Sequence, residues 1–112
     1  MVETVLLEYL NEALPVPAFM EFPEENAPDE YVILTKIGGD MTDWIYRSTV
    51  EFQCVSTSLA DAAKLCEELK DVMNSAASLP ELTKARYAGD YNATFTASKS
   101  YRYKAVYEIT HY

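Results

Sequence analysis

The sequence contains very few of the residues from which active sites are most often built. Among its 112 residues there are one histidine and two cysteines, and the histidine is His111, next to the last residue. No cysteine or carboxylate stands at metal-ligand spacing from it, and no serine or cysteine has a candidate general base. We therefore expect no enzymatic activity, no cofactor and no metal site, with His111 a surface imidazole on a strand end.

Glycine and long apolar runs are scarce as well. Three glycines, 49% hydrophobic and 12% aromatic residues describe a globular, strand-rich protein and argue against disorder. No apolar run approaches the length of a membrane span, and the first residues do not resemble a secretory signal. Cys54 and Cys66 lie in apolar patterns, so we expect two small core residues in preference to a disulfide. A protein made in a cytoplasm is the default expectation.

Positive charge is missing from the first 35 residues, where the first cation to appear is Lys36. This segment carries eight acids: Glu3, Glu8, Glu12, Glu21, Glu24, Glu25, Asp29 and Glu30. The last 32 residues reverse the balance, with Lys84, Arg86, Lys99, Arg102 and Lys104 against Glu81, Asp90 and Glu108. An acidic face on one copy could meet a basic face on the next. Pairing within one chain, or simple solvation, explains the pattern equally well.

The net charge of −9 also bears on nucleic acids. Its field repels phosphates, and no basic cluster reaches the density that nucleic-acid-binding proteins use, so no specific nucleic-acid binding is expected. The tyrosines at 101, 103 and 107 alternate along one face of a strand. This stripe favours a core or an interface over a platform for stacking bases. The acids between residues 24 and 30 lack the ligand spacing and the central glycine of a calcium loop, which indicates a solvated acidic loop.

Two segments have apolar residues at helical spacing. The first spans Val2 to Ala13 and is ended by Pro15. The second starts at Ser58, whose hydroxyl is placed to accept a hydrogen bond from the backbone N–H of residue 61. Its apolar stripe consists of Leu59, Ala62, Ala63, Cys66, Leu69, Val72 and Met73.

Five segments are predicted to be strands. Residues 16–22 suit a short edge strand, and residues 31–37 a central strand covered on both faces. A long strand begins at Trp44, after a turn predicted at Gly38-Gly39-Asp40; its outward row holds Arg47, Thr49, Glu51 and Gln53. Residues 82–96 and 100–112 form two more strands, joined around residues 97–99. The result is a single α+β domain over 1–112, with a mixed or antiparallel sheet of four to five strands on two helices, in the order α-β-β-β-α-β-β.

The order and texture of these elements point to a known class of proteins. The chain begins with a short helix, a proline-flanked first strand and an acidic loop that ends at Pro28, before Tyr31-Val32-Ile33-Leu34. It continues with a long strand from Trp44, a helix capped by Ser58 and an aromatic C-terminal hairpin. Together they resemble the small tail terminator, or tail completion, proteins of long-tailed bacteriophages and prophages, which are often labelled minor capsid or head-tail joining proteins. The resemblance covers nearly the whole chain and depends on no single motif.

The resemblance implies a structural protein of the virion, made in the cytoplasm of the bacterial host. Such subunits form a ring, typically of six copies, that caps the tail tube, ends its polymerisation and joins it to the head connector. It implies no catalytic residues. The expected partners are further copies of the chain, the tail tube and the connector. The candidate interface residues are Glu24, Glu25, Asp29, Glu30, Arg47, Lys99, Arg102 and Lys104.

A small ferredoxin-like domain that binds a ligand or regulates a partner is the alternative, because similar sheets serve many functions. A deep apolar pocket with convergent polar groups would favour that alternative. A shallow monomer with exposed apolar strand edges would favour the ring.

Overall fold

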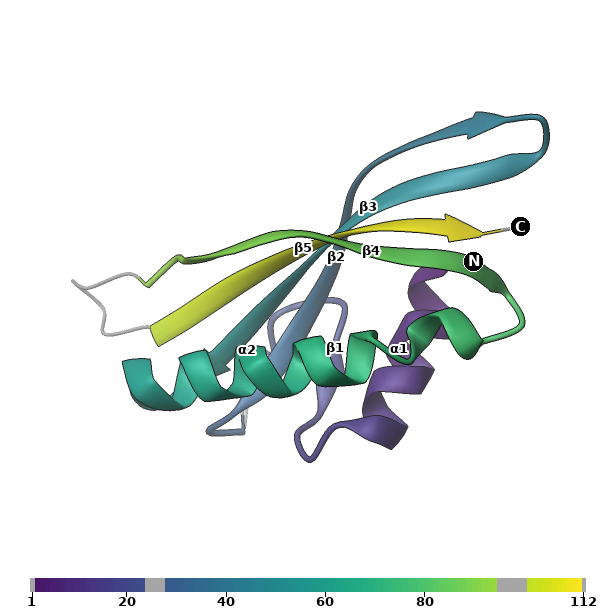
Figure 1. Cartoon of the computed structure of the whole chain (residues 1–112). Helices are drawn as coiled ribbons and strands as arrows, with labels where there is room; N and C mark the ends of the chain where they lie inside the picture. Colours follow the sequence, from purple (N-terminus) through teal and green to yellow (C-terminus); the bar gives the residue numbers. More distant parts are fainter. Residues whose placement is uncertain (1, 24–27, 95–100, 112) are drawn as a thin grey trace.

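Both helices lie on the same face of one five-stranded sheet, as Figure 1 shows. The computed structural model describes residues 2–23, 28–94 and 101–111, except for the side chain of Ala77. The elements are α1 (Val2–Ala13), β1 (Ala18–Phe19), β2 (Tyr31–Thr42), β3 (Ile45–Ser56), α2 (Leu59–Met73), the 3-10 turn η1 (Ala76–Ser78), β4 (Leu82–Asn92) and β5 (Tyr101–His111). The predicted α+β class and order of elements are confirmed.

The strand order across the sheet is β1-β2-β3-β5-β4. β1 runs parallel to β2, while the other three pairs are antiparallel. β3 is the central strand: it pairs with β2 on one side and, from Tyr46 to Ser56, with β5 on the other. β5 therefore lies between β3 and β4, which leaves β4 and the short β1 at the two edges.

The core lies between this sheet and the helices. Val50, Phe52 and Cys54 of β3 alternate with polar residues and point at the helices, as their complete burial shows. The rings of Phe52 and Tyr107 meet edge to face at 5.8 Å between centroids. The helices contribute Leu6 and Leu10 from α1 and Ala62, Leu65, Cys66, Leu69 and Met73 from α2. Leu65 was not in the predicted stripe of α2, and Leu59, which was, is 40% exposed.

Side-chain hydrogen bonds cap the start of α2 and join the helices to their neighbours. The Ser58 hydroxyl accepts from the backbone N–H of Asp61 at 3.1 Å, which confirms the predicted cap of α2. The Asn11 side chain accepts from Ala18 N–H at 2.9 Å and so holds the start of β1 against α1. The Tyr9 hydroxyl donates to the Val72 carbonyl at 2.7 Å, which joins α1 to the end of α2.

The turn between β2 and β3 is not where the sequence placed it. Gly38 and Gly39 lie within β2, opposite Thr49 and Ser48 of β3. The chain instead reverses at Asp43-Trp44, between the paired residues Thr42 and Ile45. Position 39 leaves little room for a side chain, since a Cβ there would lie 3.1 Å from the Arg47 carbonyl oxygen and from the Lys36 side chain. A bulge after Lys36 shifts the register just before the two glycines.

Three smaller expectations are also corrected. β1 has two residues instead of seven, because its pairing with β2 stops at Phe19. β2 is buried only from Val32 to Leu34, so it is not covered on both faces along its length. His111 is half-buried instead of a surface group: its ring stacks on Tyr46 at 5.5 Å, and its Nε2 lies 2.9 Å from the hydroxyl of the buried Ser48.

Candidate functional site

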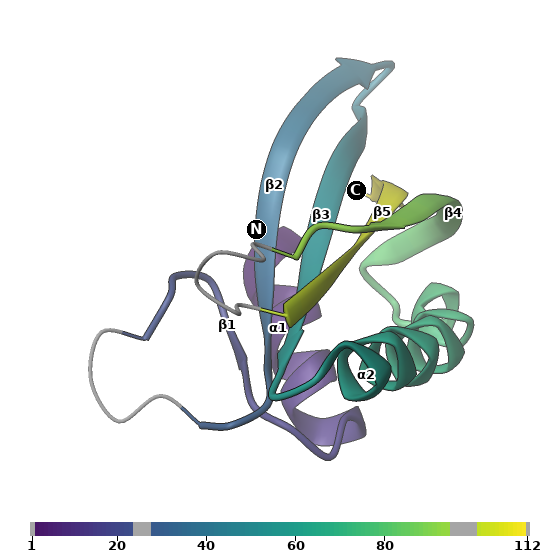
Figure 2. The same cartoon turned by 90° about the vertical axis from the view of Figure 1, so that its left-hand side faces the viewer.

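The far end of the β2–β3 hairpin projects from the body of the protein, as Figure 2 shows. We call residues 35–47 the arm; every one of them is exposed. The last pair between β3 and β5 is Tyr46 with His111, so within the described residues only the tip of the hairpin, from Thr42 to Ile45, lacks a third strand. β2 is the outer strand along the whole arm, because its short partner β1 pairs only with Val32 and Ile33. The arm therefore offers one open strand edge and an exposed tip to a partner.

The arm carries large apolar side chains that face solvent. Trp44 is 81% exposed. The others are Ile37 (54%), Met41 (49%), Tyr46 (43%) and Ile45 (41%). The register places Met41 and Tyr46 on the helix face of the sheet and Ile45 on the opposite face. These exposed apolar side chains are grouped on one projecting element, on both of its faces, which makes the arm a candidate contact surface.

The turn at the tip is held in an unfavourable conformation. Asp43 and Trp44 both have positive φ, 51° and 67°. Two-residue hairpin turns of this kind favour Asn-Gly or Asp-Gly. Aspartate tolerates the left-handed region, whereas a bulky side chain there costs about 1–2 kcal/mol. The turn itself gives no reason for an indole at position 44, which favours a role in contact.

A charged groove lies at the base of the arm, on the face of the sheet away from the helices. Its volume is about 360 Å³, and its cations are Arg47, Lys84 and Arg86. Arg47 donates to Asp40 through two nitrogens at 2.9 and 3.1 Å, and Arg86 donates to Glu108 at 2.6 and 3.0 Å. These two pairs balance, so Lys84 gives the groove its excess positive charge. We call it the basic groove.

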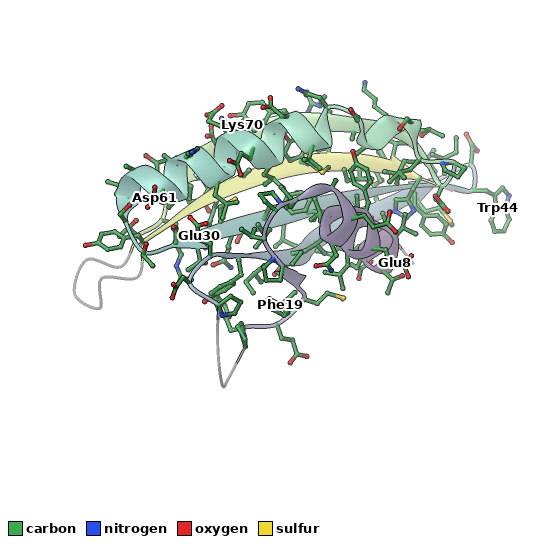
Figure 3. All side chains as sticks on the ribbon, turned by 90° about the horizontal axis from the view of Figure 1, so that it is seen from below. Glu8, Phe19, Glu30, Trp44, Asp61 and Lys70 are labelled. Carbon is green, nitrogen blue, oxygen red and sulfur yellow. The ribbon has the colours of Figure 1, made fainter. Side chains whose placement is uncertain are left out.

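A second groove, the acidic groove, lies near the start of α2. It has a volume of about 410 Å³ and is lined by Asp29, Glu30, Asp61 and Glu68, with Lys64 as its cation. Figure 3 shows Asp61 and Glu30 at one end of the molecule and Trp44 at the other. The long axis measures 45 Å against 25 and 24 Å for the other two. The two grooves therefore belong to opposite ends of an elongated subunit.

An aromatic patch accompanies the acidic end, on the face of the sheet away from the helices. Phe19 pairs with Ile33, and its ring meets that of Tyr31 edge to face at 6.1 Å between centroids. Phe22 is 48% exposed, with the Arg102 guanidinium 5.2 Å from its ring centre, and Met20 is 37% exposed. We call Phe19, Met20, Phe22 and Tyr31 the aromatic patch. Glu21, Asp29 and Glu30 are its neighbours in sequence.

The structure separates the predicted interface residues. Arg47 is at the arm end, in an exposed pair with Asp40. Asp29 and Glu30 are at the other end, where Glu30 accepts from the Ser56 hydroxyl at 2.8 Å. Glu24, Glu25 and Lys99 are outside the described residues.

Arg102 and Lys104, the two predicted interface bases on β5, lie toward the same end of the molecule as Asp29 and Glu30. Arg102 pairs in register with Val55, next to Ser56, and its guanidinium donates to Gln53 at 2.9 Å. Lys104 lies 3.4 Å from Glu51. These two cations therefore do not form a basic surface at the end of the molecule opposite to the acids. Lys84 and Arg86, which were not predicted as interface residues, supply the basic end with Arg47.

Sequence reasoning missed a polar cluster beneath α2. The Lys70 ammonium lies 2.8 Å from Asp90 and 2.9 Å from Glu67. The Cys66 sulfur is 3.8 Å from the same Asp90 carboxylate, which also accepts from the Tyr87 hydroxyl. Only a weak indication of this cluster was available in the sequence. Asp90 is an acid on the face of β4 that points toward the core, opposite Ala105.

The pKa values in this cluster follow from its contacts. The hydrogen bond from Lys70 lowers the pKa of Asp90, and the bond to Asp90 raises the pKa of Tyr87. A hydrogen bond between the thiols lowers the pKa of Cys66 and raises that of Cys54. Burial raises the pKa of Tyr107 to about 12. Cys66 is 1% exposed and Lys70 is held by two carboxylates, so the cluster fits a structural role better than a reactive one.

Metal and membrane features are missing from the described residues. No group of three or more His, Cys, Asp or Glu side chains there is arranged to hold a metal ion. None of the helices formed by those residues has the length and apolar character needed to cross a membrane.

The comparisons with known proteins leave the surface as the main guide to function. No protein-family model matches the chain, and a search of the curated proteins found no match either.

Proposed function

We propose that this protein is a structural subunit of a phage or prophage virion. It forms a ring that caps the tail tube, ends its polymerisation and joins it to the head connector, and it acts through surfaces without catalysis. The observation that carries the proposal is the arm, a protruding ribbon with exposed Trp44, Ile37, Met41, Tyr46 and Ile45. Exposed apolar side chains on a projecting element are typical of a protein that buries them against neighbouring molecules.

The shape and the distribution of charge support a ring. A ring of identical subunits needs a heterologous interface, in which two different surfaces of the subunit meet. The arm with the basic groove, at one end of a 45 Å axis, and the aromatic patch with the acidic groove, toward the other end, are two such surfaces. A subunit with equivalent ends would favour a closed dimer instead.

The alternative of a small ligand-binding domain has less support. Such sites are usually concave and mostly apolar, with a few polar groups that orient the ligand. The best-formed depressions among the described residues are the two charged grooves and a hollow of about 560 Å³ along the arm. Their linings are charged or widely exposed, which fits docking of a macromolecule better than enclosure of a metabolite.

The test is to measure assembly directly. Sedimentation velocity over a range of concentrations should show mass rising above that of the 12.7 kDa monomer, and electron microscopy should show rings on the ends of tail tubes from the phage that encodes the chain. A protein that stays monomeric at every concentration and leaves the tube ends bare would overturn the proposal.

A further inference from the structure

We propose that the partner of the arm is a second copy of this chain, and that the arm docks on the aromatic patch of that copy in a head-to-tail contact. The inference rests on the proposed self-association and specifies its geometry. The arm offers Trp44, Met41 and Ile45, and the patch offers Phe19, Met20, Phe22 and Tyr31. Aromatic side chains and methionine are enriched at the centres of protein interfaces.

Within one copy the arm and the patch are too far apart to meet. Trp44 precedes the first residue of β3, whereas Phe22 lies against Arg102, which pairs with Val55 near the other end of that strand. At about 3.3 Å per residue, the ten residues between Ile45 and Val55 span about 33 Å. The two apolar surfaces can therefore cover each other only between different copies.

Charge selects this orientation over the two symmetric ones. Head-to-tail docking places the basic groove, whose excess positive charge comes from Lys84, beside the acids that flank the aromatic patch. A patch-to-patch contact would bring Asp29 and Glu30 of two copies together in a protein whose net charge is already −9. An arm-to-arm contact would leave both aromatic patches exposed. Complementary potentials of this kind favour one register and disfavour the wrong ones.

The sequence provides a probe at the right position. Trp44 is the one tryptophan of the chain, and it is 81% exposed. Docking buries the indole in apolar surroundings, so its fluorescence emission should shift to the blue as protein concentration rises and the sedimentation coefficient increases. An increase in mass with Trp44 emission unchanged would overturn the inference while leaving the proposed self-association intact.

Two complementary variants separate the surfaces. Trp44→Gly with Met41→Ser disables the arm, and Met20→Ser with Phe22→Ser disables the patch. All four side chains are exposed, so the fold should tolerate the changes, and circular dichroism verifies this. Each variant alone should lose at least tenfold in association. A one-to-one mixture should give dimers that grow no further, because one arm and one patch remain intact per pair.

Fluorescence follows the same mixture without interference. The arm variant has no tryptophan, so all tryptophan emission comes from Trp44 of the patch variant, and it should shift to the blue when the arm variant is added. A patch variant that associates like the wild type would show that the arm docks elsewhere. A mixture without dimers, with each variant alone monomeric, would also overturn head-to-tail docking.

Tyr91→Ser is the matched control. Tyr91 is 50% exposed, comparable to Phe22, but lies on the edge strand β4 outside the aromatic patch. This variant should associate like the wild type, and an equal loss of association would overturn the assignment of the patch. A wild-type protein that never associates under any condition would instead contradict the proposed function itself.

Discussion

At the scale of single residues, Trp44 shows a conflict between stability and contact. Its φ of 67° places an indole where hairpin turns favour glycine. We expect Trp44→Gly to raise the free energy of unfolding of the monomer by about 1 kcal/mol, because it relieves the left-handed strain. Urea denaturation at a concentration that keeps the wild type monomeric measures this. Trp44→Ala, which removes the indole but keeps the strain, should leave the stability within about 0.5 kcal/mol; equal effects of the two would contradict the argument.

Asp90 gives a second prediction at the residue scale. Asp90→Asn removes its ion pair with Lys70, and we expect the free energy of unfolding at pH 7 to fall by about 1 kcal/mol, since the pair is partly solvated. The fold lowers the pKa of Asp90 from 3.8, so the carboxylate contributes stability above that pH and loses it as pH falls through the lowered value. Urea denaturation at pH 7 and pH 3 should show the difference between variant and wild type shrink at the lower pH.

Glu67→Gln is the control for Asp90. Glu67 also binds Lys70, but its side chain is 70% exposed. We expect a loss of less than about 0.5 kcal/mol at either pH. A loss at Glu67 equal to that at Asp90 would show that partial burial of the Asp90 pair is unimportant.

At the scale of elements, the sequence predicted what depends on local patterns and missed what depends on distant packing. Both helices and the terminal hairpin have apolar periodicities that tertiary contacts reinforce, so α1, α2, β4 and β5 were found close to their observed bounds. The hairpin turn was misplaced because Gly38-Gly39 is a strong local turn signal. In the structure both glycines lie within β2, and Gly39 approaches the Lys36 side chain and the β3 backbone closely, which no local pattern reveals.

The Ser58 cap allows a prediction for a whole element. Ser58→Ala removes the acceptor for the Asp61 N–H, which lies at 3.1 Å, and should lower the free energy of unfolding by about 1 kcal/mol. Ser75→Ala is the matched control, because Ser75 stands at the corresponding position of η1 without a side-chain capping bond. Thermal denaturation should separate the two variants. An equal effect at both positions would show that α2 depends on packing alone and not on its cap.

At the scale of the whole molecule, the sequence indicated charge asymmetry but located half of it wrongly. The acids at Asp29 and Glu30 do mark one end. Arg102 and Lys104, expected to form the basic surface, lie toward the same end, because β5 runs antiparallel to β3 and begins beside the end of β3. The basic groove needed Lys84 and Arg86 of β4 beside Arg47 of β3, a neighbourhood set by the strand order β3-β5-β4. Strand order is a property of the packed sheet, which the pattern along the chain does not determine.

This arrangement allows net charge and local charge to be separated in one experiment. Lys84→Glu in the basic groove and Lys64→Glu in the acidic groove change the net charge equally, so any repulsion between whole molecules rises by the same amount. Head-to-tail docking sets acids beside Lys84, so Lys84→Glu should weaken association severalfold at low salt. Lys64→Glu adds an acid at the end that receives a basic surface, so it should leave association unchanged or strengthen it. The difference should shrink in 0.5 M salt, where the screening length falls to about 4 Å. Equal weakening by both variants in sedimentation velocity would mean that overall repulsion, and not the placement of charge at the two ends, governs how copies meet.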